Sequence, residues 1–90
     1  MKIRVGPDAY NGFLEIPAGD YWVTLNSDSG LIVLHAAGRD VKLKASCRRR
    51  RIKSKGTMVS FYSGGGNQWS VVVASEKYGE WVATVEYRAG

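Results

Sequence analysis

Several stretches of this chain alternate apolar and polar residues with a period of two. Tyr21, Val23 and Leu25 fall on one face of an extended segment, and Val71 and Val73 do the same further along. Such alternation is typical of strands that have one buried and one wetted face. No window of helical length has a clean 3.6-residue apolar period. The pattern therefore predicts an all-β protein.

Glycine and Asn/Asp/Ser clusters divide the chain into short segments. Ala37–Arg39 and the stretch from Gly64 to Asn67 are typical tight connections between strands. We expect strands at about residues 2–5, 12–16, 20–26, 31–36, 40–47, 57–63, 68–75 and 80–88. Seven to eight short strands predict a small antiparallel β-sandwich or β-barrel, formed by residues 1–90 as a single domain.

The pattern also assigns side chains to the interior. His35 continues an apolar strand, so we expect a packed or half-exposed histidine. Cys47 is in phase with Val41 and Leu43, which predicts a buried, inert thiol. A small domain needs large side chains to fill its core. The aromatic residues expected there are Trp22, Phe61, Trp69 and Trp81.

Charge changes this picture at one place. The chain has 13 Lys and Arg against 8 Asp and Glu, a net charge of +5. Residues 39–55 hold nine of the cations and one carboxylate, Asp40, so the rest of the chain is slightly acidic. Four consecutive arginines, 48–51, cannot share one face of a regular strand. We therefore expect a projecting basic β-ribbon with its turn near Ser54–Gly56, a basic loop, or a disordered arm.

Arginine can donate two parallel hydrogen bonds to one phosphate. The basic segment thus predicts binding of a polyanion, nucleic acid foremost, through sequence-independent phosphate contacts. The plainer interpretation is a solvated face, or charges that protect an exposed edge strand from pairing. The candidate nucleic-acid-binding residues are Arg39, Lys42, Lys44, Arg48, Arg49, Arg50, Arg51, Lys53 and Lys55.

Two other functions fit the same features. The first is a nucleotide-sensing module. An arginine cluster on a small barrel is similar to PilZ domains, which bind cyclic diguanylate with an RxxxR motif followed by D/NxSxxG. Here Ile52 stands four residues after Arg48 and no D/NxSxxG follows. The second is an interaction or assembly domain, in which an exposed edge strand pairs between copies to form a homo-oligomer and Ile52 anchors a partner.

Catalysis, metals and membranes are not expected. One histidine and one cysteine are too few for a structural zinc site, and no acid pair or Ser/His/Asp set stands out by spacing. Gly64–Gly66 lacks the Lys-Ser/Thr ending of a phosphate-binding loop. The sequence thus predicts a non-enzymatic domain without a cofactor. Its apolar runs are too short to span a bilayer, and a lone cysteine favours a cytoplasmic protein.

Overall fold

The computed structural model describes residues 1–6, 8–53 and 55–87, and these form ten β-strands and no helix. The predicted all-β fold is therefore confirmed. The strands are β1 (Lys2–Val5), β2 (Ala9–Asn11), β3 (Leu14–Ile16), β4 (Gly19–Asn26), β5 (Leu31–Ala36), β6 (Arg39–Lys44), β7 (Ser46–Arg49), β8 (Thr57–Gly65), β9 (Gln68–Ser75) and β10 (Gly79–Tyr87).

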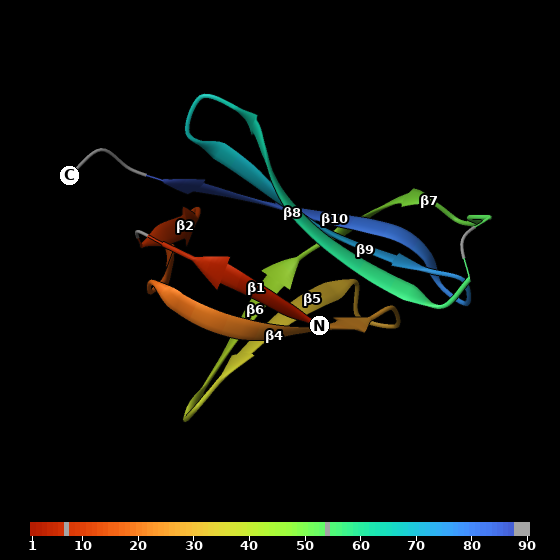
Figure 1. Cartoon of the computed structure of the whole chain (residues 1–90), viewed down its shortest axis with the longest axis horizontal. Helices are drawn as coiled ribbons and strands as arrows, with labels where there is room; N and C mark the ends of the chain where they lie inside the picture. The colour runs from red at the N-terminus through yellow and green to blue at the C-terminus, as the bar shows by residue number, and fades with distance from the viewer. Residues whose placement is uncertain (7, 54, 88–90) are drawn as a thin grey trace.

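Two antiparallel sheets pack face to face, as the two layers of Figure 1 show. Sheet A has the strand order β1-β4-β5-β6. Sheet B has the order β3-β2-β10-β9-β8, and β7 also pairs with β10. β1 and β6 lie at the ends of sheet A, and β3 and β8 lie at the ends of the main strand order of sheet B. Within the described ranges, no helix is long and apolar enough to cross a membrane.

The structure has more strands than the seven to eight predicted, for two reasons. Within the segment expected as one strand at 12–16, only Leu14–Ile16 forms a strand, β3, and it pairs with the unpredicted strand β2 across a turn at Gly12, whose φ is 62°. The segment expected as one strand at 40–47 is divided at Ala45. β6 before Ala45 belongs to sheet A and β7 after it belongs to sheet B, so the chain passes from one layer to the other at this residue.

The core lies between the two sheets. Ile32, Leu34 and Leu43 of sheet A are fully buried, and so are Val71 and Val73 of sheet B. Each such side chain stabilises the fold by about 1.5–3 kcal/mol relative to exposure. The period-two alternation therefore identifies the inner faces correctly.

The aromatic side chains divide between the core and the surface. Phe61, Trp69 and Trp81 are partly buried and pack against the core, in line with the prediction. The rings of Phe61 and Trp69 lie 5.0 Å apart, and Tyr87 meets Trp69 edge-on at 5.8 Å. These contacts extend the core toward one end of sheet B.

Two core assignments were wrong. Trp22 is 58% exposed, because the alternation that buries Tyr21 and Val23 turns the residue between them outward. Cys47 is exposed. Its predicted burial assumed one continuous strand from Val41, but the chain changes sheets at Ala45, and every residue of β7 is exposed.

The first residue of β10 makes a close approach that no other amino acid could make without strain. Gly79 has a φ of 86° and is buried against the end of β7. A Cβ atom at Gly79 would overlap the carbonyl oxygen of Arg49 and lie 2.8 Å from that of Arg50. This contact lets the arginine-rich backbone turn directly over the end of β10.

Replacing Gly79 by Ala is therefore expected to destabilise the fold. Gly38→Ala is the matched control, since Gly38 has a φ of 71° but a Cβ atom there would meet nothing within 4 Å. We expect Gly79→Ala to lower the free energy of unfolding by about 1–3 kcal/mol more than the control does. Urea denaturation measures both variants, and equal losses would contradict the close packing.

Candidate anion-binding groove

A β-bulge determines how the first arginines are presented. In the ladder between β7 and β10, Cys47 lies opposite Trp81 and Arg49 lies opposite Glu80, with a register shift between them. Arg48 is the extra residue of this bulge. A bulge interrupts the regular alternation of side chains, so Arg48 and Arg49 both reach Glu80. The expectation that consecutive arginines point to opposite faces is therefore wrong at this pair.

Glu80 accepts a two-pronged hydrogen bond from Arg48. The Nε and Nη2 atoms of Arg48 donate to the two carboxylate oxygens of Glu80, at 3.1 and 3.0 Å. The Nε of Arg49 lies 3.7 Å from one of the same oxygens. The Glu80 side chain is only 17% exposed, against 49% for Arg48 and 73% for Arg49. One carboxylate thus partly neutralises two guanidinium groups.

The protonation of this cluster follows from its hydrogen bonds. Hydrogen bonding from Arg48 outweighs burial and lowers the pKa of Glu80, and the charges of Arg48 and Arg49 act in the same direction. The hydrogen bond to Glu80 raises the pKa of Arg48 most, and a hydrogen bond to Tyr62 acts in the same direction. The Arg48–Glu80 pair is therefore fully ionised near neutral pH.

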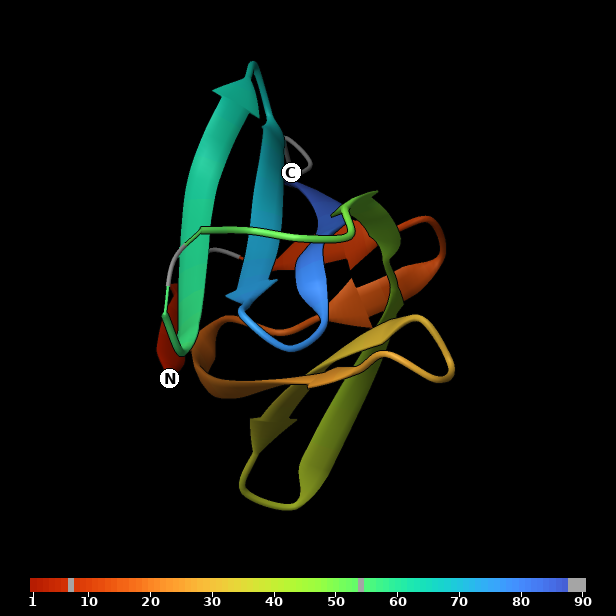
Figure 2. The same cartoon turned by 90° about the vertical axis from the view of Figure 1, so that its right-hand side faces the viewer.

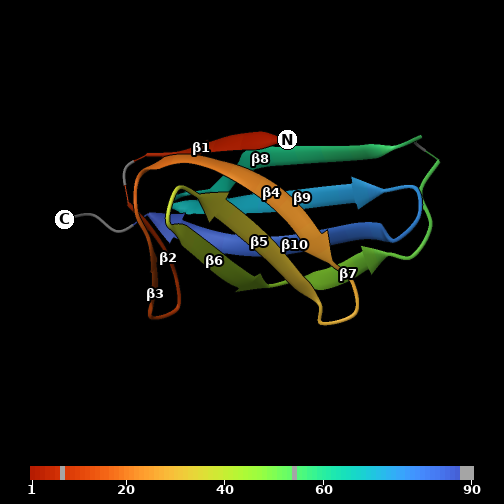
Figure 3. The ribbon, with the colours of Figure 1, turned by 90° about the horizontal axis from the view of Figure 1, so that it is seen from below.

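After β7 the chain passes over one end of sheet B, beside the β9–β10 hairpin (Figure 3). Figure 2 shows residues 50–53 passing in front of this sheet on the way from β7 to β8. At the far side, the backbone N–H of Gly56 donates to a carboxylate oxygen of Glu76 at 3.1 Å, and the backbone N–H of Glu76 donates to the Gly56 carbonyl at 2.9 Å. The basic segment is therefore a crossing strap rather than a projecting ribbon or an arm. Of the turn expected near 54–56, Ser54 lies outside the described residues.

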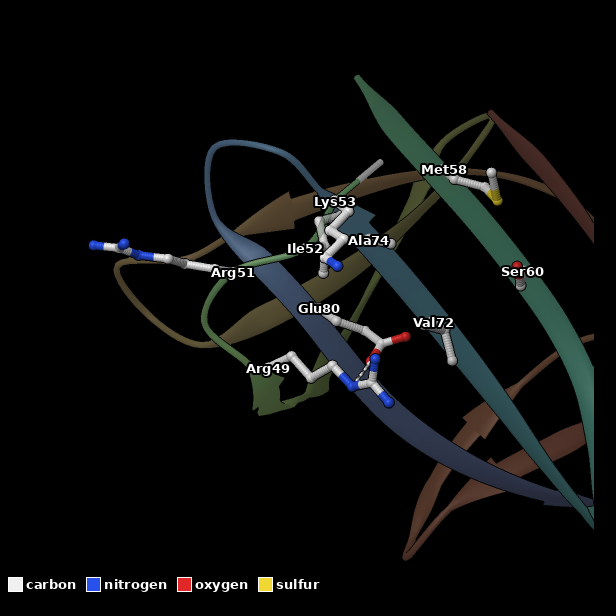
Figure 4. Close-up of a pocket in the computed structure, with 9 residues that line it drawn as sticks. All are labelled: Arg49, Arg51, Ile52, Lys53, Met58, Ser60, Val72, Ala74 and Glu80. Carbon is white, nitrogen blue, oxygen red and sulfur yellow. Dashed lines mark ion pairs between the residues drawn. The ribbon is translucent and has the colours of Figure 1, made fainter. Parts of the chain in front are cut away.

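Residues 51–53 and the outer face of sheet B line an open groove of about 610 Å³. Figure 4 shows its lining, with Arg49 directed at Glu80 and Arg51 pointing away from the sheet. Val72 on the floor of the groove is only 5% exposed although it faces away from the core. The lining residues are Arg49, Arg51, Ile52, Lys53, Met58, Ser60, Val72, Ala74 and Glu80. The groove thus combines a basic rim, an apolar floor and one carboxylate.

The predicted binding residues do not form a single patch. The structure brings together the later members at one end of sheet B, namely Arg48, Arg49, Arg50, Arg51, Lys53 and Lys55. Lys42 and Lys44 lie on the exposed face of sheet A, because Val41 and Leu43, which alternate with them along β6, are buried.

Arg39 lies at the start of β6, beside Tyr21, whose hydroxyl donates to the Pro17 carbonyl at 2.6 Å. Burial raises the pKa of Tyr21, and the neighbouring Arg39 acts in the opposite direction. Arg39 thus belongs to the β5–β6 end of sheet A and is not part of the groove.

Four cations of the crossing strap have no acidic partner among the residues that the structure describes. Within residues 1–6, 8–53 and 55–87, no carboxylate oxygen lies within 4.0 Å of the charged nitrogens of Arg50, Arg51, Lys53 or Lys55. Like charges along so short a segment repel one another, and a bound anion relieves that repulsion. The strap is therefore the part of the site most available to a phosphate.

Sequence reasoning missed Glu80 as a member of the site, and it considered Tyr62 only as a ring that could stack on an unpaired base. Glu80 lies far along the chain from the arginines, and only the pairing of β7 with β10 brings it to them. In the described part of the chain, no group of three or more His, Cys, Asp or Glu residues is arranged to hold a metal ion. Comparison of the chain with known protein families, curated proteins and solved structures found no match.

The ion pair makes the stability of the fold depend on pH in a defined direction. The pKa of Glu80 is lower in the folded than in the unfolded chain. Its contribution to stability is therefore complete above the unfolded-state value of about 4.3 and is lost as the pH falls through the lower folded-state value.

We expect Glu80→Gln to be less stable than the parent at about pH 7, with a deficit that shrinks as the pH is lowered into the acid range. Urea denaturation across this range measures the difference. Glu15→Gln is the control, since the exposed Glu15 forms no ion pair with any residue described here. A Glu80→Gln deficit that is independent of pH would contradict the assignment.

Proposed function

We propose that this domain binds a polyanion, nucleic acid foremost, through the cationic strap at one end of sheet B. The observation that supports this most directly is a set of four cations that form no ion pair within the described part of the chain, namely Arg50, Arg51, Lys53 and Lys55. Their backbone is tied at one end by Gly79 and at the other by Glu76. Arg50, Arg51 and Lys53 therefore have a defined backbone path before a ligand binds.

The mechanism is neutralisation of phosphates with release of their counterions. Guanidinium and ammonium groups contact the backbone of a nucleic acid, which carries no sequence information, so binding is independent of base sequence. Arg51 extends away from the sheet and suits such contacts (Figure 4). The proposed role is binding rather than catalysis.

Glu80 acts as an internal competitor in this proposal. Its carboxylate occupies Arg48 and draws on Arg49, and a phosphate would take the place of that carboxylate. The two guanidinium groups are thus held in position but partly neutralised. Removing the Glu80 charge should strengthen polyanion binding even though it weakens the fold.

Duplex DNA binding by paired variants tests the strap. Arg50→Ala/Arg51→Ala removes two charges from the strap, and Arg4→Ala/Arg39→Ala removes the same charge elsewhere. We expect the strap variant to lose roughly 10-fold in affinity at low salt and the control to lose much less, because phosphate contacts dominate such binding. Filter binding measures both, and equal losses would show that only net charge matters.

A nucleotide-sensing function is the second candidate, and the groove favours it. An apolar floor beside a basic rim suits a ligand that has a flat ring and a phosphate. Calorimetry with a panel of cyclic dinucleotides should then show saturable one-to-one binding that Ser60→Trp, which fills the groove, abolishes. Absence of heat with the whole panel would contradict this second function and leave the first intact.

A further inference from the structure

The outer face of sheet A carries a row of side chains that the strap does not use. Lys2, Trp22, His35 and Asp40 lie opposite one another across the four strands. Figure 3 looks onto this sheet and shows no described segment crossing it. Trp22 stands on β4, between β1 and β5, with 58% of its surface exposed. A tryptophan this exposed is unusual, since the residue is highly buried on average.

A second flat ring lies beside Trp22 and is held at both of its nitrogens. The Nδ1 of His35 lies 2.8 Å from an Asp40 carboxylate oxygen, and its Nε2 lies 2.7 Å from the Thr24 hydroxyl. In the tautomer whose Nδ1–H donates a hydrogen bond to Asp40, the Nε2 atom accepts a hydrogen bond from the Thr24 hydroxyl. Two hydrogen bonds fix the orientation of the ring, and the His35 side chain is 38% exposed. The sequence spacing did not reveal this cluster.

The order carboxylate, imidazole and hydroxyl is that of a hydrolytic triad, but the surroundings do not suit one. β4 and β5 each have a neighbour on both sides, so their backbone N–H groups are engaged in the ladders. The N–H groups of β4 and of the His35 strand are therefore not free to stabilise an oxyanion. We therefore interpret Thr24 and Asp40 as residues that position His35.

Three lysines lie on the same face of sheet A as the two rings. The ammonium of Lys2 lies 5.9 Å from the centre of the Trp22 ring. Lys42 and Lys44 are exposed on β6, beside the half-buried Val33 and Leu31. No carboxylate of the described residues lies within 4.0 Å of any of these three ammonium groups. The face thus offers aromatic surface and positive charge together.

We propose that this face of sheet A binds single-stranded nucleic acid. An unpaired base stacks on Trp22, with His35 as the adjoining surface, and the flanking phosphates contact Lys42 and Lys44. The positive charge favours an anionic ligand over a neutral sugar or an uncharged peptide. Stacking requires a base with a free face, which a duplex does not offer. The proposal does not depend on the strap, which lies on the other sheet.

The test follows the indole N–H signal of Trp22 by NMR during titration with oligothymidylate and, separately, with a duplex of the same length. The chain has three tryptophans, and the signal missing from Trp22→Ala identifies that of Trp22. We expect this signal to shift with the single strand and to stay in place with the duplex. Lys42→Ala/Lys44→Ala should weaken the titration.

Affinity for the single strand should fall by roughly 5- to 150-fold in Trp22→Ala and largely recover in Trp22→Phe. Phe13→Ala is the control, because Phe13 is a fully exposed aromatic in the β2–β3 turn. An unmoved indole signal, or equal affinities of Trp22→Ala and the control, would overturn the proposal. The proposal for the strap is tested separately, because it fails only if Arg50→Ala/Arg51→Ala binds duplex DNA as well as its control does.

Discussion

The contact between Gly79 and the backbone of Arg49 and Arg50 is the constraint on which the basic end of this molecule depends. It allows β7 to end against β10 and the chain to turn at once across sheet B. Without it, repulsion among adjacent arginines would favour an extended, mobile segment. The contact converts a run of charge in the sequence into a strap of defined path, with a groove beneath it.

A second consequence of the fold is that the positive charge is divided between two surfaces. Because the chain changes layers at Ala45, Lys42 and Lys44 face outward from sheet A, while Arg48 and Arg49 belong to sheet B and the later arginines follow directly after it. The strap has cations and an apolar groove, and the face of sheet A has cations and the exposed ring of Trp22. These differences in chemistry suit phosphate contacts at the first and base stacking at the second.

Much of the fold was predictable because period-two burial depends only on local alternation, and a two-residue turn such as Ala37–Gly38 fixes register. That turn places His35 opposite Asp40, so this pair could have been found from the sequence. The change of sheet at Ala45 and the bulge at Arg48 could not, since both depend on how distant strands pack. The errors at Cys47 and in the single basic patch follow from these two irregularities.

The central claim is that the unpaired cations of the strap neutralise phosphates, and the salt dependence of duplex DNA binding measures this most directly. If Arg50, Arg51, Lys53 and Lys55 each displace a counterion, the slope of the logarithm of the association constant against that of the salt concentration should be roughly −4. A slope near zero, or no binding at low salt, would contradict the account.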